Sequence, residues 1–457
     1  KNGQFEPVGA MYVEPDCNIP TAESLVRQCL YGQQTYKRMF GKTVNNAWLP
    51  DVFGNSWILP QILKKSGVDY FVSNKMSTWN DTNRFPHNNF IWKGIDGTDV
   101  LACVPPTHFI TWNMPSQIQE NWEAYIDKDS GGQTMNMFGY GDGGSGCTEE
   151  MIELMHRFDK LSIMPKCEHM GGQEFLEKNL KNNKELQTWD GELYLEMHRG
   201  TFTTKSEMKR ANRRLEYKLR DAEMLSVLRG EDNRQAITSA YKKLLINQFH
   251  DILPGSHIHP VYEDAMKDYS DIEKCVDGII GTGSKYFNTL NFTRDALTFV
   301  PNKKGTSTRY GVRGNWIIPN IPALSSSSLR ANKYADEWMS FDGEKLETPF
   351  YSAVLNQDGS IASLIDKKQD RQWVDGDFNK LKIYTDHPGN YDAWDILPNY
   401  KDKQIEINVK EKLALAELDG ECATFKTVLS TEKSTWTMLI RFFRRSCGIE
   451  VENIVDW

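Results

Sequence analysis

The sequence predicts an α/β domain, then a helical bundle, then a mainly antiparallel β region, because the hydrophobic periodicity changes twice along the chain. Up to about residue 195, short apolar runs alternate with amphipathic stretches, a pattern typical of an α/β domain with a mainly parallel sheet. Between about 205 and 280 apolar residues recur every three or four positions, which is the helical period. Beyond about 285 that period is lost and turn residues separate short strands. We therefore expect domains over 1–195, 196–284 and 285–457.

The first region contains one clear helix and four candidate strands. Residues 59–67 read as a helix because proline follows its first residue and glycine closes it. The candidate strands are short apolar segments bounded by polar or turn residues: 46–49, 68–72, 99–104 and 134–138. This alternation is the basis for predicting an α/β domain.

The middle region reads as an antiparallel three-helix bundle. Its first two helices share the helical period and are separated by the turn sequence GEDN at 230–233. Pro254 and Gly255 indicate the end of the second helix, and a third periodic stretch runs from Ala265 to Ile279.

The last region contains hairpin signals. Residues 350–355 and 360–365 flank a turn with Asp358 and Gly359, and 436–443 is another strand candidate. The final residues, 451–457, still read as a strand at the end of the chain. We expect an antiparallel β-sandwich that the sequence leaves incomplete.

Composition limits the class of protein. The 54 Lys and Arg against 62 Asp and Glu give a formal net charge of −8, which provides no general attraction to nucleic acid or to an anionic membrane. No apolar run approaches the ~18 residues of a membrane span. The eight cysteines are scattered, without a C-x-x-C pair, so we expect a reducing compartment and a cytoplasmic protein. Homo-oligomerisation is left open.

Two aspartates follow candidate strands of the predicted sheet. Asp51 comes after 46–49 in a turn that begins with Pro50, and Asp142 lies in the glycine-rich loop after 134–138. Functional groups of open α/β sheets gather at the carboxyl ends of the strands, and two carboxylates facing one crevice are the minimum for glycoside hydrolysis. The alternative is that both are ordinary turn or cap aspartates.

His250 is the most informative histidine, because the sequence places it at the carboxyl end of the second bundle helix and Asp251 follows it. It is either a metal ligand with a carboxylate neighbour or a cation favoured at a helix end. Arg199, near the junction between the sheet region and the bundle, would either address sugar hydroxyls or pair with an acid.

Several motifs together resemble the glycoside hydrolase family 38 α-mannosidases, in particular the bacterial and cytosolic or vacuolar branch. They are YVEPDCN at 12–18, ESLVRQ at 23–28, WLPDVFG at 48–54, LPQILKKSG at 59–67, FIWKGIDG at 90–97, YGDGG at 140–144, HRGT at 198–201, QFHDILPG at 248–255 and YDAWDI at 391–396.

The resemblance implies a retaining α-mannosidase that acts on mannose-containing oligosaccharides or glycans with the help of Zn²⁺. By motif, Asp51 resembles the nucleophile and zinc ligand, His250 a second zinc ligand, and Asp142 the acid/base. Asp251 resembles a sugar-contacting carboxylate, and Arg199 is assigned to substrate binding. One departure stands out, because the His-x-Asp motif of the family's first strand does not precede residue 12. We expect a fragment of a longer enzyme, with a partial α/β catalytic domain. One alternative is that another chain contributes the missing strand; another is a non-catalytic carbohydrate-binding relative or an inactive fragment with an incomplete zinc site.

Overall fold

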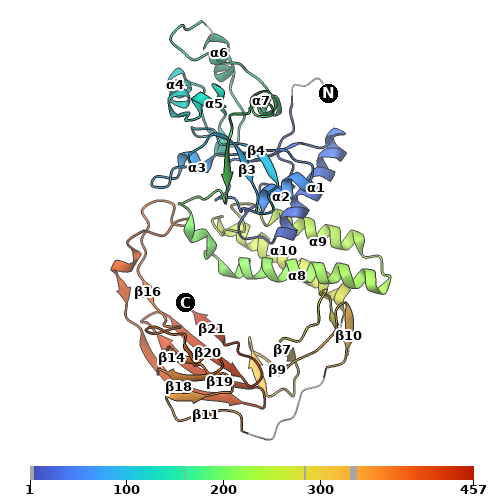
Figure 1. Ribbon diagram of the computed structural model, residues 1–457, viewed down its shortest axis with the longest axis vertical. Helices are drawn as coiled ribbons and strands as arrows, with labels where there is room; N and C mark the ends of the chain where they lie inside the picture. Colours follow the sequence, from blue (N-terminus) through green and yellow to red (C-terminus); the bar gives the residue numbers. More distant parts are fainter. Residues whose placement is uncertain (1–4, 159, 282–284, 330–336) are drawn as a thin grey trace. The chain divides into compact units, whose positions relative to one another are not determined.

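The computed structural model of the protein describes residues 5–158, 160–281, 285–329 and 337–457. They form two compact units (Figure 1). Unit 1 comprises residues 1–280 together with 388–396, and unit 2 comprises 281–387 and 397–457. The short segment 388–396 therefore returns to unit 1 after the chain has entered unit 2.

Unit 1 contains a five-stranded sheet in the order β1-β2-β4-β3-β5. Its strands are β1 (Asn46–Leu49), β2 (Tyr70–Ser73), β3 (Asn89–Lys93), β4 (Asp99–Cys103) and β5 (Gln187–Asp190). Three of the four pairings are parallel, and only the β3–β4 hairpin is antiparallel. The prediction of a mainly parallel sheet is confirmed.

Both faces of this sheet are covered, as the alternation of side chains along a strand requires. Ala47, Leu49 and Phe71 pack on one face with residues of α1 and α2, whereas Tyr70 and Val72 pack on the other with residues of α7. The helices of this layer are α1 (Ala22–Phe40), α2 (Leu59–Lys65), α3 (Lys75–Thr78), α4 (Pro115–Ala124), α5 (Lys128–Gly131), α6 (Glu149–Phe158) and α7 (Gly172–Asn179).

The segment 134–138 is not a strand, contrary to the prediction. Its apolar residues suit a strand, but its carbonyls are bonded by side chains: Asn121 Nδ2 donates to Met135 O at 3.1 Å and Thr111 Oγ1 donates to Met137 O at 2.7 Å. An isolated bridge between Thr111 and Gly139 follows. The segment is therefore extended backbone fixed by side chains, outside the sheets of the described residues.

The three-helix bundle is confirmed. It consists of α8 (Ser206–Arg229), α9 (Arg234–Ile246) and α10 (His259–Ile280), whose buried residues form one core with Tyr31 of α1. Gly230 ends α8 in the left-handed conformation, at φ 68°. The second helix ends at Ile246, earlier than the predicted stop at Pro254 and Gly255, so His250 lies four residues beyond the helix.

Unit 2 is built of antiparallel sheets, as predicted. The five-stranded sheet is β11 (Ser340–Phe341), β12 (Lys345–Glu347), β13 (Tyr351–Leu355), β14 (Ile361–Asp366) and β15 (Arg371–Gln372), and the four-stranded sheet is β18 (Asn408–Leu418), β19 (Cys422–Ser430), β20 (Thr435–Phe443) and β21 (Glu450–Asp456). Smaller sheets are formed by β7 (Thr298–Pro301), β9 (Val312–Ile317) and β8 (Ser307–Arg309), by β6 (Tyr286–Asn288) and β10 (Ser325–Ser327), and by β16 (Ile383–Tyr384) and β17 (Gln404–Ile405).

The two larger sheets share one hydrophobic core, to which Leu346 and Leu355 contribute from the first and Phe425 and Ile440 from the second. This is the face-to-face packing of a sandwich. The predicted hairpin is present as β13 and β14, with Gly359 at φ 83° in its turn.

All eight cysteines are free thiols, which agrees with the expectation that the chain has no disulfide framework. Among the helices of the described ranges, none combines the length and hydropathy that a membrane crossing requires.

Candidate active site

Asp51 and Lys75 face one another because they occupy equivalent positions after two paired strands. Leu49 of β1 lies opposite Ser73 of β2 in a parallel register, and each charged residue comes two positions later. Lys75 Nζ is 2.8 Å from Asp51 Oδ1, and the Lys75 side chain is only 8% exposed. The ammonium also lies 4.6 Å from the centre of the Phe53 ring. Lys75 is not among the site residues predicted from the sequence.

His250 reaches the same carboxylate from the segment that follows α9. This segment forms an antiparallel bridge between Phe249 and Pro15, and His250 N donates to Glu14 O at 3.1 Å. The imidazole Nδ1 is 3.0 Å from the same carbonyl, so Nδ1 carries the proton and donates it. Nε2 then faces Asp51 Oδ2 at 3.5 Å. The structure thus brings together Asp51 and His250, as predicted, but through a β-bridge and not through a helix end.

The electrostatics of this pair favour a charged carboxylate. Burial raises the cost of ionising Asp51, but the hydrogen bond with His250 and the charge of Lys75 outweigh it and hold the pKa of Asp51 below its usual range. For His250, burial opposes the charged imidazolium, but the neighbouring Asp51 and Asp251 carboxylates outweigh it and raise the pKa of the ring. Both shifts share one cause, the attraction between an ionised Asp51 and a protonated His250 ring.

The family resemblance implies a zinc ion between Asp51 and His250. An imidazole Nε2 and a carboxylate oxygen are ordinary zinc ligands, and a histidine whose Nδ1 donates to a backbone carbonyl is oriented as metal-binding histidines usually are. The buried position of His250 and the lowered pKa of Asp51 suit such a site, whereas the raised pKa of His250 means that a metal ion would have to displace a proton from Nε2. Within the described part of the chain, however, no cluster of three or more His, Cys, Asp or Glu side chains has metal-binding geometry. Asp51 and His250 therefore fit as two ligands of an incomplete set.

Asp251 lies at the edge of this cluster and is more accessible, with 42% of its side chain exposed. Its Oδ2 is 4.0 Å from His250 Nε2. Its Oδ1 accepts a hydrogen bond from Ser256 Oγ at 3.0 Å and lies 3.4 Å from the indole nitrogen of Trp394. An accessible, oriented carboxylate of this kind suits a contact to substrate hydroxyls.

His198 is a second residue that the sequence analysis did not single out. It is 3% exposed, and its backbone nitrogen and Nδ1 both bond to the carboxylate of Asp395, with Nδ1 at 3.1 Å. Phe53 and Trp79 lie against the ring, with centroids 5.0 and 5.5 Å away. Burial, followed by the positive charge of Lys75, lowers the pKa of His198. The segment 388–396 of unit 1 therefore holds His198 in place through Asp395.

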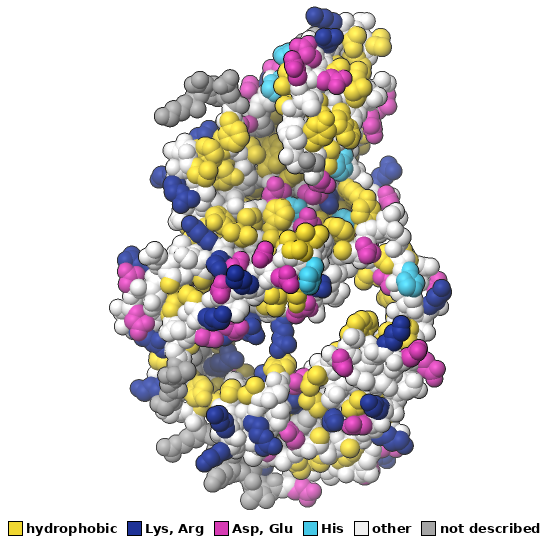
Figure 2. Space-filling view, turned by 180° about the vertical axis from the view of Figure 1, so that it is seen from behind, with side chains coloured by type: hydrophobic (Ala, Val, Ile, Leu, Met, Phe, Trp, Pro, Cys, Tyr) yellow, Lys and Arg dark blue, Asp and Glu magenta, His cyan; other side chains and the backbone are white. Residues whose placement is uncertain are grey.

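One face of the molecule shows a similar mixture of side-chain types. Seen from behind, acidic and histidine side chains gather there with hydrophobic side chains on either side (Figure 2). Apolar walls around a few polar groups are typical of small-molecule sites.

Asp142 lies in the exposed short turn η1 (Gly141–Gly143), as expected for the glycine-rich loop. Gly141 has φ 49°, and a Cβ there would lie 2.3 Å from the Ile110 side chain, so only glycine fits this turn. The nearby His108 has a pKa lowered by burial, against the opposing pull of both Asp51 and Asp142. The negative charges of both predicted catalytic carboxylates therefore act on the imidazole of His108.

Arg199 packs against Tyr194 and Phe202, with its guanidinium carbon 4.1 and 5.4 Å from the two ring centroids. Its Nη2 is buried and has no hydrogen-bond partner among the described residues. The contacts place it in an aromatic setting, and substrate binding by Arg199 stays a prediction.

Comparison with known sequences gives three consecutive matches. Residues 1–192 match the glycosyl hydrolases family 38 N-terminal domain, 196–286 the alpha mannosidase middle domain, and 346–457 the glycosyl hydrolases family 38 C-terminal domain. The chain belongs to glycoside hydrolase family 38. The predicted family and fold class are thereby confirmed.

Among the family 38 relatives of the chain are alpha-mannosidase 2C1 of Mus musculus, 33% identical over 86% of this chain and 40% of the relative, and an alpha-mannosidase of Saccharomyces cerevisiae, 30% identical over 96% and 42%. The chain thus spans less than half the length of these relatives. The crystal structure of an alpha-mannosidase from Enterococcus faecalis has the same fold, with a TM-score of 0.73 at 14% identity, over 98% of this chain and 65% of that one.

Proposed function

We propose that this family 38 chain acts in the hydrolysis of α-linked mannosides in oligosaccharides or glycans, by a retaining double displacement. The observation that carries the proposal is the contact of Asp51 with Lys75 and His250 at the carboxyl ends of parallel strands. The relatives named alpha-mannosidase support the choice of sugar.

In this mechanism Asp51 attacks the anomeric carbon, since its lowered pKa keeps it ionised. Asp142 donates a proton to the departing glycosidic oxygen and then takes one from the incoming water, which its exposed position permits. Lys75 orients the nucleophile by holding Oδ1. Asp251 accepts hydrogen bonds from sugar hydroxyls, and Arg199 contacts the substrate.

Asp51 and His250 would hold the zinc ion, with the Glu14 carbonyl fixing the tautomer of His250. When bound, the ion supplies Lewis-acid contacts to the sugar oxygens. The described residues contain no group of three or more His, Cys, Asp or Glu side chains that could hold the ion, so Asp51 and His250 would need a further ligand.

The test is hydrolysis of an aryl α-mannoside with zinc supplied, with the anomer of the first product determined by NMR. We expect the α-anomer, and a loss of about 10²–10⁴-fold in kcat for both Asp51→Asn and Asp142→Asn. Asp69→Asn is the matched control, because Asp69 precedes β2 at the opposite end of the sheet and pairs with the exposed Lys64. Unchanged activity in either site variant, or loss in the control, contradicts the assignment.

A second candidate, a carbohydrate-binding chain without catalysis, is favoured by the two-ligand donor set within the described ranges. It predicts mannoside binding without turnover when zinc is supplied. The same assay, combined with a binding titration, separates the two functions.

We further propose a reducing, cytoplasmic location, which the eight free thiols support. Fractionation of the source cells, with thiol labelling of the native protein, tests it. A disulfide between any two of the cysteines in the isolated protein would contradict it.

A further inference from the structure

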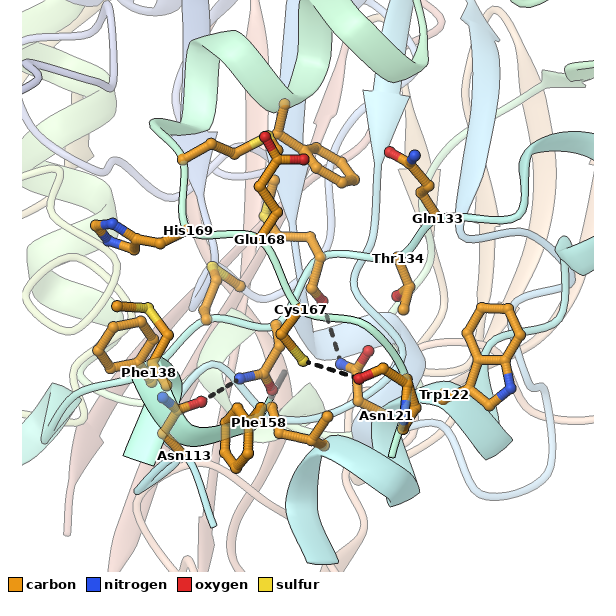
Figure 3. Close-up of a pocket in the computed structure, with 18 of the residues that line it drawn as sticks. Asn113, Asn121, Trp122, Gln133, Thr134, Phe138, Phe158, Cys167, Glu168 and His169 are labelled. Carbon is orange, nitrogen blue, oxygen red and sulfur yellow. Dashed lines mark hydrogen bonds between the residues drawn. The ribbon is translucent and has the colours of Figure 1, made fainter. Parts of the chain in front are cut away.

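The α/β domain contains a cavity of about 1330 Å³ that the mechanism above does not use. Its walls come from the end of β1, the extended segment 133–139, α4 and the chain between α6 and α7, shown in close-up in Figure 3. Small-molecule sites usually have volumes of ~300–1,000 Å³, so this space admits a ligand larger than one sugar ring.

The lining is rich in uncharged hydrogen-bonding groups. Amide and hydroxyl side chains line it together with the rings of Trp122, Phe138 and Phe158 (Figure 3). The amides are those of Asn113, Gln119, Asn121, Gln133 and Asn136, and the hydroxyls are those of Thr134, Ser145 and Ser162. Amides both donate and accept, as sugar hydroxyls require, and aromatic faces suit the apolar faces of sugar rings. The charged lining residues have both signs, with Glu123 and Glu168 against Lys166, so they do not select an anion.

Two oxygens of the wall lack a partner. Thr134 Oγ1 and Asn136 Oδ1 are buried, and neither has a hydrogen bond among the residues that the structure describes. The two residues are two positions apart on extended backbone, so their side chains lie on the same side of the segment. A buried polar atom without a partner is costly. Both residues line the cavity, so a rotation of either side chain towards the space would let a ligand hydroxyl pair with its oxygen.

Neighbouring side chains already hold the wall in place. Asn121 Nδ2 donates to Met135 O, between the two unpaired residues, and to Thr107 Oγ1 at 2.7 Å. Asn113 Nδ2 donates to Met151 O at 3.0 Å. A wall fixed in this way is preorganised, which reduces the entropy lost on binding.

The cavity adjoins the proposed catalytic loop. Gly139, Gly141 and Ser145 border it on both sides of Asp142 in the sequence, and Pro50, next to Asp51, borders it as well. Asp142 is the residue assigned to protonate the departing oxygen, so a ligand in this space lies on the leaving-group side of the scissile bond.

We propose that this cavity is a subsite for the sugar residues on the leaving-group side of an oligomannoside. The proposal rests on the proposed function for its choice of sugar. It assigns to Thr134, Asn136 and Gln133 the hydrogen bonds to those residues, and to Trp122 a stacking contact.

Binding is tested by calorimetric titration of the purified chain with an S-linked α-mannotrioside, which resists hydrolysis. Thr134→Val removes one unpaired oxygen with little change of volume. Asn136→Leu removes the other and, with it, the long bond of 3.4 Å from Asn136 Nδ2 to Asn113 Oδ1. Gln133→Ala alters an exposed rim residue, so the fold tolerates it. Thr188→Val, on the exposed face of β5 and outside the cavity, is the matched control.

We expect each cavity variant to weaken mannotrioside binding by about 3- to 10-fold, as the loss of one hydrogen bond implies. The control leaves the affinity unchanged. Absence of binding, or equal affinity in the parent chain and in Gln133→Ala and Thr134→Val, overturns the proposal.

Hydrolysis of an aryl α-mannoside separates this result from a failure of the proposed function. If the mannotrioside binds and the cavity variants weaken it while no hydrolysis occurs, the subsite stands and the catalytic proposal fails. If hydrolysis occurs and the cavity variants leave both mannotrioside affinity and mannotriose kcat/KM unchanged, the subsite fails alone.

Discussion

Replacement of Lys75 by Met removes the cation that holds Asp51 and leaves the length of the side chain nearly unchanged. The ion pair is short, at 2.8 Å, and largely buried, with side-chain exposures of 8% for Lys75 and 23% for Asp51. Loss of one partner from such a pair leaves a charge in a low-dielectric environment without compensation, which is costlier than the loss of the pair as a whole.

The magnitude follows from the burial. Breaking a fully buried pair costs about 3–5 kcal/mol, whereas an exposed pair contributes about 0–1 kcal/mol. Asp51 keeps some exposure, and its Oδ2 still faces His250, so we expect the Lys75→Met variant to lose about 2–3 kcal/mol, below the buried range. In a domain of the size of unit 1, this loss lowers the melting temperature by about 4–6 °C.

The assay is differential scanning calorimetry of chelator-treated protein, read on the transition that contains unit 1. Lys64→Met is the matched control, because Lys64 Nζ lies 2.7 Å from Asp69 Oδ1 with both side chains more than 40% exposed. It should shift the transition by less than about 2 °C. Adding Asp51→Asn to Lys75→Met should recover much of the loss, since the uncompensated charge is then gone. Equal shifts in the two lysine variants, or no recovery in the double variant, would refute the reasoning.

Three further predictions concern other parts of the chain. Gly141→Ala should accelerate hydrogen exchange in the Asp142 loop, since its Cβ would overlap the Ile110 side chain; unchanged exchange contradicts this. His198 should titrate by NMR below its usual pKa of ~6.5, so the stability it contributes is present above that pH and is lost as the pH falls towards the folded pKa; its signal is assigned by its absence in His198→Gln. Arg441→Leu should destabilise unit 2 by about 3–5 kcal/mol in urea denaturation, because the fully buried guanidinium lies 2.7 Å from the carboxylate of the buried Glu452, which would lose its counter-charge; a loss below about 1 kcal/mol contradicts this.

Much of the fold could be predicted because local signals and tertiary structure agree. Helix α2 has proline at its start and Gly67 after its end, and Gly230 separates α8 from α9 in a conformation that glycine favours. The segment 134–138 shows where such signals fail, because the side chains of Asn121 and Thr111 bond its carbonyls. Strand periodicity reports which residues are apolar, and it does not report what the backbone bonds to.

The candidate site was predictable to the extent that its residues follow strands or lie in distinctive motifs. Asp51 and His250 were predicted as site residues in this way, and His250 Nε2 lies 3.5 Å from Asp51 Oδ2. The role of Glu14 was not accessible, because it acts through its backbone carbonyl and any residue type can supply one. His198 depends on Asp395, nearly 200 positions later, and no local pattern joins the two.

Lys75 is different, since the sequence did contain the signal that identifies it. Parallel strands in register bring residues at equal distances from the strand ends to the same place, and both Asp51 and Lys75 stand two positions after the pair Leu49 and Ser73. A search for carboxylates alone at the strand ends therefore finds Asp51, the proposed nucleophile, and misses its counter-charge. Since Lys75 holds Oδ1 and His250 faces Oδ2, both oxygens of Asp51 have assigned positions before any ligand binds. In the proposed mechanism a carboxylate fixed at both oxygens loses little entropy when it reacts. The register of two strands supplies the contact at Oδ1, and the bridge between Phe249 and Pro15 supplies the one at Oδ2.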